Sequence, residues 1–201
     1  MRTLAQNGIR KCRLLVTGQT TSYVDYDDGY YEKGVAKPTA AYTVLSTGQY
    51  SGTTAITINA KTDTHSNNCV LDNNTGLMWS RYQAASVGPG SDGLLPWTTT
   101  GSGATAEGIF PYCLAANTAS LAGWTDWRIP NLYELLSIGI AEAPGSGPNS
   151  TAFPSYNTAY GWTSTTRAAG TSSAMAVRHT DLSLSSDLKT ATKNVILVRG
   201  G

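Results

Sequence analysis

The chain has 201 residues, which is enough for one large domain or for one domain with a substantial appendage. Hydrophobic residues make up 40% of the sequence, but charged residues make up only 13%, about half of their usual share in soluble domains. The net charge is +1 and no basic run exceeds Arg10–Arg13, which argues against nucleic-acid binding. No stretch approaches the roughly 20 apolar residues of a membrane-spanning helix, which excludes membrane insertion by that route.

The composition and the N-terminus point in different directions. Ser, Thr, Gly, Asn and Tyr replace the missing charges, as in many extracellular and virion proteins. However, the first residues lack the continuous apolar run of a signal peptide. Two explanations remain open, namely release by cell lysis, as for a bacteriophage structural protein, or a mature fragment whose signal was removed. Met1 favours the first.

The first third of the chain predicts strands separated by a loop. Residues 9–17 alternate well enough to predict a strand, and residues 18–38, rich in Gly, Asp and Tyr, predict a loop with many turns. Between residues 41 and 60, β-branched residues and Tyr are interrupted by Gly48 and Gly52, which predicts two short strands.

A hairpin and a long loop follow. Two apolar runs within residues 69–81 flank Asp72–Gly76, whose residues tolerate turn conformations, so this segment predicts a β-hairpin. Residues 86–104 are polar and rich in Gly and Pro. This segment is too long for a simple connector and is therefore either functional or an insertion.

Two helices are expected next. Residues 106–119 predict the first, in which Pro111 is compatible with a helix start. Residues 132–140 predict the second, because Asn131 can cap its N-terminus and Glu134 stands where a capping box needs it.

After a loop at residues 144–150, strands are expected at residues 160–166, 173–179 and 194–200. This order of strands, helices and strands predicts an α+β fold with an antiparallel sheet.

The cysteines and histidines show no recognisable motif. Cys12, Cys69 and Cys113 are widely spaced and form no CxxC pair, so they can be one disulfide with a free thiol or three buried free thiols. His65 and His179 have no neighbouring metal ligand, and no nucleophile-elbow GxSxG occurs. We therefore expect surface histidines rather than catalytic ones.

Six pieces of the sequence together form a recognisable ordered pattern. They are GQTTSYVDYDDGYYEKGV (18–35), DNNTGLMW (72–79), YCLAAN (112–117), GWTDWRIPNLYELLSI (123–138), WTSTT (162–166) and VRGG (198–201). In this order they resemble the Lcl C-terminal domain family, which is named for a collagen-like bacterial adhesin and is related in fold to C-type lectins and formylglycine-generating enzymes.

The resemblance implies one C-type-lectin-like α+β domain over residues 1–201, with a small twisted antiparallel sheet, two helices and long irregular loops. Residues 1–60 are a candidate extension used in assembly. The formylglycine-generating relatives depend on an active-site cysteine pair. By resemblance, this pair would be expected in the C-terminal third of the chain. That third contains no cysteine, since all three precede residue 114, which argues against inherited oxidase activity.

The segment 123–131 is best interpreted as structural. Its Trp side chains would bury large areas, Arg128 could hold Asp126 or loop carbonyls, and Pro130 would keep Ile129 extended before the cap at Asn131. A ligand stacked on an exposed Trp is the alternative. The residues expected to shape the fold are Trp79, Trp124, Asp126, Trp127, Arg128, Pro130, Asn131, Glu134 and Trp162.

The carboxylates of Asp25, Asp27 and Asp28 beside a glycine form the best candidate metal site. They could supply the oxygen ligands that Ca²⁺ prefers, although no Glu closes an EF-hand pattern. The alternative, which we favour, is a hydrated loop of Asx-turns.

Three functions are considered. The first is a bacteriophage tail-fibre, tail-tip or head-decoration protein, non-enzymatic and homo-oligomeric, with a trimer expected by analogy with fibres. It would contact other virion proteins and a host glycan or protein through the 86–104 and 144–158 loops. The second is a secreted bacterial adhesin for polysaccharides, and the third is an enzyme. The candidate stacking residues are Tyr82, Trp97, Tyr156 and Tyr160.

Overall fold

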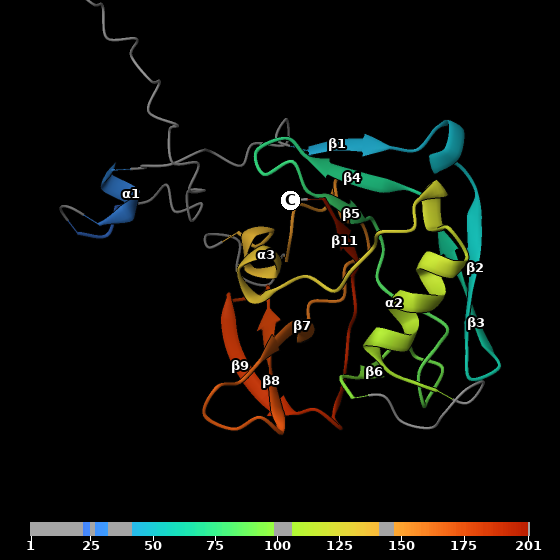
Figure 1. Cartoon of the computed structure of the whole chain (residues 1–201). Coiled ribbons are helices and arrows are strands. Elements are labelled where there is room, and N and C mark those ends of the chain that lie inside the picture. Colours follow the sequence, from blue (N-terminus) through green and yellow to red (C-terminus); the bar gives the residue numbers. More distant parts are fainter. Residues whose placement is uncertain (1–21, 25–26, 32–41, 99–105, 141–146, 201) are drawn as a thin grey trace, which may run out of the picture.

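The computed structural model describes residues 22–24, 27–31, 42–98, 106–140 and 147–200 (Figure 1). In these residues helices combine with several small antiparallel sheets, so the predicted α+β class is confirmed. The expected single small sheet is instead divided among sheets of four, three, two and two strands. The strand predicted at residues 9–17 lies outside the described residues.

The four-stranded sheet contains both the first and the last of the described strands. Its order is β1-β4-β5-β11. Its members are β1 (Tyr42–Leu45), β4 (Cys69–Asp72), β5 (Met78–Ser80) and β11 (Val198–Arg199). β4 and β5 form the predicted hairpin, in which Gly76 has a φ of 76° and donates its N–H to the Asp72 carbonyl. Of the apolar residues that predicted this hairpin, Val70, Leu77, Met78 and Trp79 are buried and Leu71 is half-buried.

A second hairpin was only half predicted. β2 (Thr53–Ile58) was expected, but its partner β3 (Lys61–Ser66) was not, because its sequence KTDTHS lacks an apolar face. The turn between them places Asn59 and Ala60 at φ values of 48° and 57°, as in the type I′ turns that suit a twisted hairpin.

The remaining strands lie in two sheets. β7 (Gly161–Thr166), β8 (Ser173–Arg178) and β9 (Ser183–Leu188) form a three-stranded sheet, and β6 (Leu95–Pro96) pairs with β10 (Thr192–Lys193). β9 was not predicted because its serines give no strand signal.

The prediction of one continuous strand over residues 194–200 is wrong, because only β11 within this range belongs to a sheet ladder. Residues 194–197 are buried and bond to scattered partners instead, such as the N–H groups of Ser80 and Ala84. The run is apolar because it crosses the core, and not because it lies within one sheet.

The two longer helices lie close to their predicted positions, whereas a third, short helix lies in the segment that was predicted to be a loop. The short α1 (Asp28–Tyr31) precedes β1, α2 (Ile109–Thr118) contains Pro111 in its first turn, and α3 (Leu132–Ser137) follows Asn131. The Asn131 side chain accepts the Glu134 N–H, and the Glu134 side chain accepts the Asn131 N–H, which confirms the capping box. The described residues also form two short 3₁₀ helices, η2 (Gly48–Tyr50) and η4 (Leu121–Gly123).

The core consists of two apolar clusters, each beneath one of the two longer helices. One lies under α2 and includes Ile56, Tyr112, Trp127 and Trp162. The other lies under α3 and includes Trp79, Leu135, Phe153 and Val177. α2 packs on β2, and α3 packs on β7 and β8. The helices therefore cover different sheets.

A buried polar cluster joins β3 to α2. The Tyr112 hydroxyl donates to Asp63 Oδ2 at 2.8 Å, and His65 Nδ1 lies 3.2 Å from the same oxygen. Burial alone raises the pKa of Asp63, but hydrogen bonds from His65 and Tyr112 outweigh it, so the net pKa is below the usual 3.8. The ionised carboxylate of Asp63 therefore contributes to the stability of the folded state.

The expectation of surface histidines is wrong. His65 is 3% exposed and His179 is fully buried, where its Nε2 lies 2.8 Å from the Leu135 carbonyl oxygen. Each imidazole combines an apolar ring with hydrogen-bonding nitrogens, so each can fill a core position that offers a polar partner. Both histidines act as packing groups between a strand and a helix.

The capping box can be tested with Asn131→Ala. The substitution removes the acceptor of the Glu134 N–H bond, so the free energy of unfolding should fall by about 1 kcal/mol. Urea denaturation monitored by circular dichroism measures this change. Tyr133→Ala in the same helix is the control, because Tyr133 is exposed, and should be near neutral. Equal stability of Asn131→Ala and the native chain would contradict the role of the cap.

The Asp63 cluster predicts a pH-dependent contribution to stability. Because the folded-state pKa of Asp63 is lowered, its stabilisation is present above the unfolded pKa of about 3.8 and is lost as pH falls through the folded value. Asp63→Asn should therefore cost about 2 kcal/mol at pH 7, and this difference from the native chain should shrink below about pH 4.

Urea denaturation at a series of pH values measures this difference. Asp126→Asn is the comparison, since Asp126 also has a lowered pKa but is exposed, and it should cost much less at every pH. A cost of Asp63→Asn that stays constant down to pH 2 would refute the assignment.

Candidate functional site

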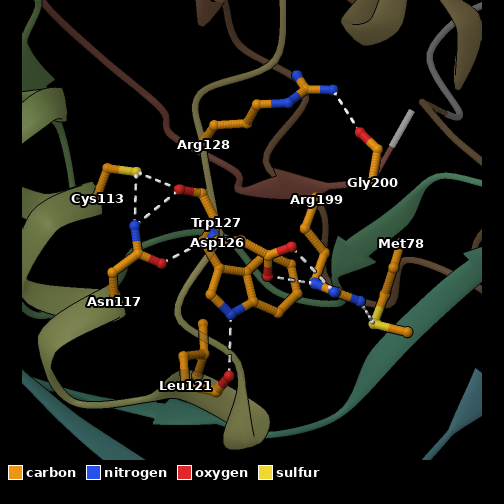
Figure 2. Close-up of polar contacts among 9 residues, drawn as sticks. All are labelled: Met78, Cys113, Asn117, Leu121, Asp126, Trp127, Arg128, Arg199 and Gly200. Atoms are coloured by element: carbon orange, nitrogen blue, oxygen red, sulfur yellow. Dashed lines mark hydrogen bonds and ion pairs between the residues drawn. The ribbon is translucent and has the colours of Figure 1, made fainter.

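The segment 123–131 is anchored to α2 through Asn117. The Asn117 side chain accepts the Trp127 N–H at 2.7 Å and donates to the Trp127 carbonyl at 2.8 Å (Figure 2). The Trp127 indole N–H donates to the Leu121 carbonyl at 2.9 Å. The Asn117 side chain thus satisfies the backbone N–H and carbonyl of Trp127, as a neighbouring strand would in a sheet. The indole of Trp127 fills the core under α2.

Arg128 connects this segment to α3 and to the C-terminal strand. Its guanidinium donates to both oxygens of Glu134, each at 2.7 Å, and to the Gly200 carbonyl at 2.9 Å. The predicted pairing with Asp126 is wrong, and the carbonyl that Arg128 binds follows β11 instead of lying in a loop between a strand and α3. Asp126 instead accepts two bonds from Arg199, at 2.7 and 3.0 Å (Figure 2).

The pKa shifts agree with these pairings. The hydrogen bond from Arg199 lowers the pKa of Asp126. Burial would raise the pKa of Glu134, but the bonds from Arg128 and the Asn131 N–H lower it overall. Both carboxylates are therefore engaged as ionised acceptors in holding the chain together.

The tryptophans of the motif are packed rather than presented to solvent. The Trp124 ring lies 3.7 Å from the guanidinium carbon of Arg199, and Trp162 donates its indole N–H to the Leu95 carbonyl. The indole N–H groups of Trp79 and Trp124 find no acceptor among the described residues.

An apolar groove runs between the outer face of α2 and the β2–β3 hairpin, and it is the candidate functional site. Its volume is about 1130 Å³, and no charged residue lines it. Phe110 and Leu114 project from α2, with 40% and 68% of their surface exposed. The lining residues are Ala55, Thr57, Ile58, Asn59, Ala60, Ala106, Phe110, Pro111, Leu114, Ala115, Thr118 and Ala119.

The sequence contained an unused signal for this groove. α2 reads IFPYCLAANT and has no charged residue, although an ordinary surface helix places charged and polar side chains on its outer face. Its inner face buries Ile109, Tyr112, Cys113 and Ala116, which leaves Phe110 and Leu114 exposed on the outer face. A helix that is apolar on both faces indicates a second contact.

A partly buried ion pair lies at one end of the groove. Glu107, which is 7% exposed, accepts from the Asn59 side chain at 2.6 Å and pairs with Lys61 at 3.2 Å. Lys61 also donates to the carbonyls of Gly88 and Pro89. The hairpin turn is thereby tied to the segment that precedes α2, which holds the two walls of the groove together at this end.

The four predicted stacking residues do not line the groove, and each is already engaged. Trp97 donates its indole N–H to the Thr163 carbonyl, lies edge-on to Phe110 with ring centroids 4.8 Å apart, and has Lys189 Nζ 3.9 Å from its ring. Tyr160 has its hydroxyl 3.1 Å from the Ser183 hydroxyl and contacts Arg178 and Lys193 through its ring.

The other two stacking residues differ from each other. Tyr156 packs edge-on against Phe153 and His179, and burial raises the pKa of its hydroxyl. Tyr82 is half-buried beside Arg81. A ligand-binding role of these residues stays a prediction, but Trp97, Tyr156 and Tyr160 also have packing roles.

The loops expected to form the recognition surface are anchored in their described parts. Within residues 86–104, Val87 and Leu95 are fully buried. Within residues 144–158, Phe153 is buried, and the carbonyls of Thr151 and Ala152 accept bonds from Arg81. These segments therefore support the fold.

The carboxylate cluster lies partly outside the described residues. Nothing is described for Asp25 or for the Asp28 side chain. The Asp27 carboxylate accepts the N–H groups of Tyr23 and Tyr30, each at 2.9 Å, which is the geometry of a local turn and helix cap. In the described residues no group of three His, Cys, Asp or Glu side chains could hold a metal ion.

Cys69 and Cys113 are buried free thiols, and Cys12 lies outside the described residues. Burial raises the pKa of the Cys113 thiol to about 11 and that of Cys69 to about 12. Both thiols stay protonated at neutral pH, and the Cys113 thiol donates to the Trp127 carbonyl. Neither thiol is prepared for nucleophilic or redox chemistry.

Comparison with known proteins identifies the family. No curated protein matches the chain. The sequence model of the Lcl C-terminal domain matches residues 68–199, which is more than half of the chain and contains α2, α3 and the 123–131 segment. The chain belongs to the Lcl C-terminal domain family.

Proposed function

We propose that the chain is a non-enzymatic surface protein of a bacteriophage virion that binds a protein partner through the apolar groove along α2. The partner is another virion protein or a host surface protein that presents an uncharged, apolar segment. Homo-oligomeric assembly, in a tail fibre, tail tip or head decoration, is part of this proposal. Low charge and a surface rich in hydroxyl groups support it.

The groove is the observation that carries the proposal. Soluble monomers rarely expose contiguous apolar surface without a use for it, and Phe110 and Leu114 are exposed one helical turn apart. The neutral lining favours an apolar partner segment over a charged glycan. The walls are held together at one end, which reduces the ordering needed on binding.

The finer fold assignment is also a proposal. A C-type-lectin-like body is supported by the family match, by the small sheets and by the long loops that pack on one another. In such a body a rigid core holds a surface whose side chains can vary without loss of the fold.

A polysaccharide-binding bacterial adhesin is the second candidate. Cationic side chains lie over aromatic rings near the β7–β9 sheet, with Lys189 on Trp97 and both Arg178 and Lys193 on Tyr160. Asp181 and Asp187 pair with Arg178 and Lys193, however, which leaves little net positive charge for an anionic sugar. An enzyme is the third candidate and has the least support, because the histidines and cysteines of the described residues are buried.

The groove predicts a specific effect of Leu114→Glu. A carboxylate in an apolar contact should weaken partner binding by about tenfold or more, whereas stability should change little because Leu114 is 68% exposed. A phage lacking the chain, complemented in trans, gives two measurements: copies of the chain per particle, and the rate of adsorption to host cells. One of these should fall.

Tyr133→Glu is the matched control, because Tyr133 is exposed on α3 and does not line the groove. It should support both native copy number and native adsorption. If Leu114→Glu is equal to the control in both measurements, the groove is not the binding surface.

The virion context predicts that the chain copurifies with particles. Mass spectrometry of density-purified virions should detect it at a stoichiometry fixed from one preparation to the next. Detection in a bacterial secretome together with absence from virions would replace the virion proposal with the adhesin.

A further inference from the structure

The outer edge of β9 carries backbone groups that are directed away from the protein. In the described residues β9 pairs only with β8, and it forms the edge of the three-stranded sheet (Figure 1). The Lys189 N–H donates to the Ser172 carbonyl, whereas the Ser173 carbonyl accepts from Arg167 on the other side. Strand backbone groups alternate in direction, so Ser183, Ser185 and Asp187 face β8. The groups of Leu184, Ser186 and Leu188 face outward.

The same three residues share one face of the sheet, and two of them are exposed leucines. Leu184 is 49% exposed and Leu188 is 59% exposed. Leu184 lies opposite Val177, which is buried under α3, so the apolar layer of this face continues to the edge of the sheet and stops there uncovered.

β9 lacks the features that usually protect an edge strand. Its sequence SLSSDL contains no Lys, no Pro and no glycine bulge, and its register with β8 is regular over six residue pairs. Its one charged residue, Asp187, is paired with Lys193 of the same chain. The strand therefore carries no unpaired charge that would repel a second strand at its edge.

We propose that β9 pairs antiparallel with β9 of a second copy of this chain, about a two-fold axis at Ser186. In this register, Ser186 exchanges N–H···O bonds with Ser186 of the second copy. Leu188 N–H donates to the carbonyl of the second copy's Leu184, and the symmetric bond forms at the other end. The Leu188 carbonyl already accepts the Ala191 N–H and has a second lone pair for the remaining bond.

This register also pairs the exposed leucines. Leu184 of each copy lies directly opposite Leu188 of the other, and both pairs are on the face that α3 covers elsewhere. Backbone direction and side-chain pattern therefore select the same alignment. Pairing about Ser185 or Asp187 would place the leucines opposite serines or beyond the strand.

The product is a two-fold dimer with a six-stranded sheet, two copies of three strands. The edge alone is smaller than a standard protein interface, so the dimer should be weak and should depend on concentration. A trimer would have to use another surface.

Sedimentation velocity of the full chain over a series of concentrations tests the proposal. The native chain should shift from monomer to dimer. Ser186→Pro removes an outward N–H for which the described residues offer no acceptor, so it should raise the dimer Kd by about tenfold or more and leave the melting temperature of the monomer nearly unchanged. Ser186→Ala keeps the N–H and should dimerise like the native chain.

A charge exchange tests the register itself. Leu184→Lys with Leu188→Lys places like charges opposite each other and should abolish the dimer, whereas Leu184→Glu with Leu188→Lys places each Glu opposite a Lys of the other copy and should restore it in low salt. A native chain that stays monomeric at all concentrations overturns the proposal. So does an oligomer that is insensitive to Ser186→Pro and to the double Lys variant.

Discussion

The guanidinium of Arg128 is the junction on which the arrangement of α3 and the C-terminal strand depends. It holds both oxygens of Glu134, and Glu134 in turn accepts the Asn131 N–H at the start of α3. The same guanidinium binds the Gly200 carbonyl, while the Arg128 backbone exchanges hydrogen bonds with Val198 at 2.8 and 2.9 Å. A planar fork with several donors can satisfy these acceptors together, whereas a Lys ammonium could not bind a carboxylate in this bidentate way. One residue thus connects α3, through Glu134, with β11 and with the Gly200 carbonyl that follows it.

The same segment also sets the position of α2 and therefore of the groove. Residue 127 is bound on its backbone by Asn117 of α2, and its indole fills the space beneath that helix. Because the inner face of α2 is held in this way, Phe110 and Leu114 are directed outward against the hairpin, whose turn is tied to Glu107. The 123–131 segment and the groove thus contact opposite faces of α2. The motif contributes to binding only by holding this wall of the groove in place.

The elements that the sequence predicts correctly are those whose conformation depends on residues close together in the chain. The β4–β5 hairpin follows from Asp72–Gly76 and its flanking apolar runs, and α3 follows from Asn131 and Glu134 three residues apart. The predictions failed where distant residues decide. Asp63 and His65 lie in a segment without an apolar pattern, and they are buried because Tyr112, far along the chain, bonds to them from α2. Arg199 was needed to show why Asp126 does not pair with Arg128. β9 has no apolar alternation of its own, and its pairing with the apolar strand β8 decides its conformation.

The two proposed contact surfaces use different chemistry and lie on opposite sides of the molecule. The groove along α2 offers side-chain contacts, whereas the β9 edge offers backbone hydrogen bonds in one register. In Figure 1, α2 and the β2–β3 hairpin lie at the right and β9 at the left. Pairing at β9 would therefore leave the groove of each copy open and directed away from the partner. A ligand displayed repeatedly, as on a virion or a cell surface, would then meet two grooves on one body, so that a weak contact at each could sum to firm attachment. Low surface charge suits this arrangement, because neither contact needs charged groups to be stripped of water.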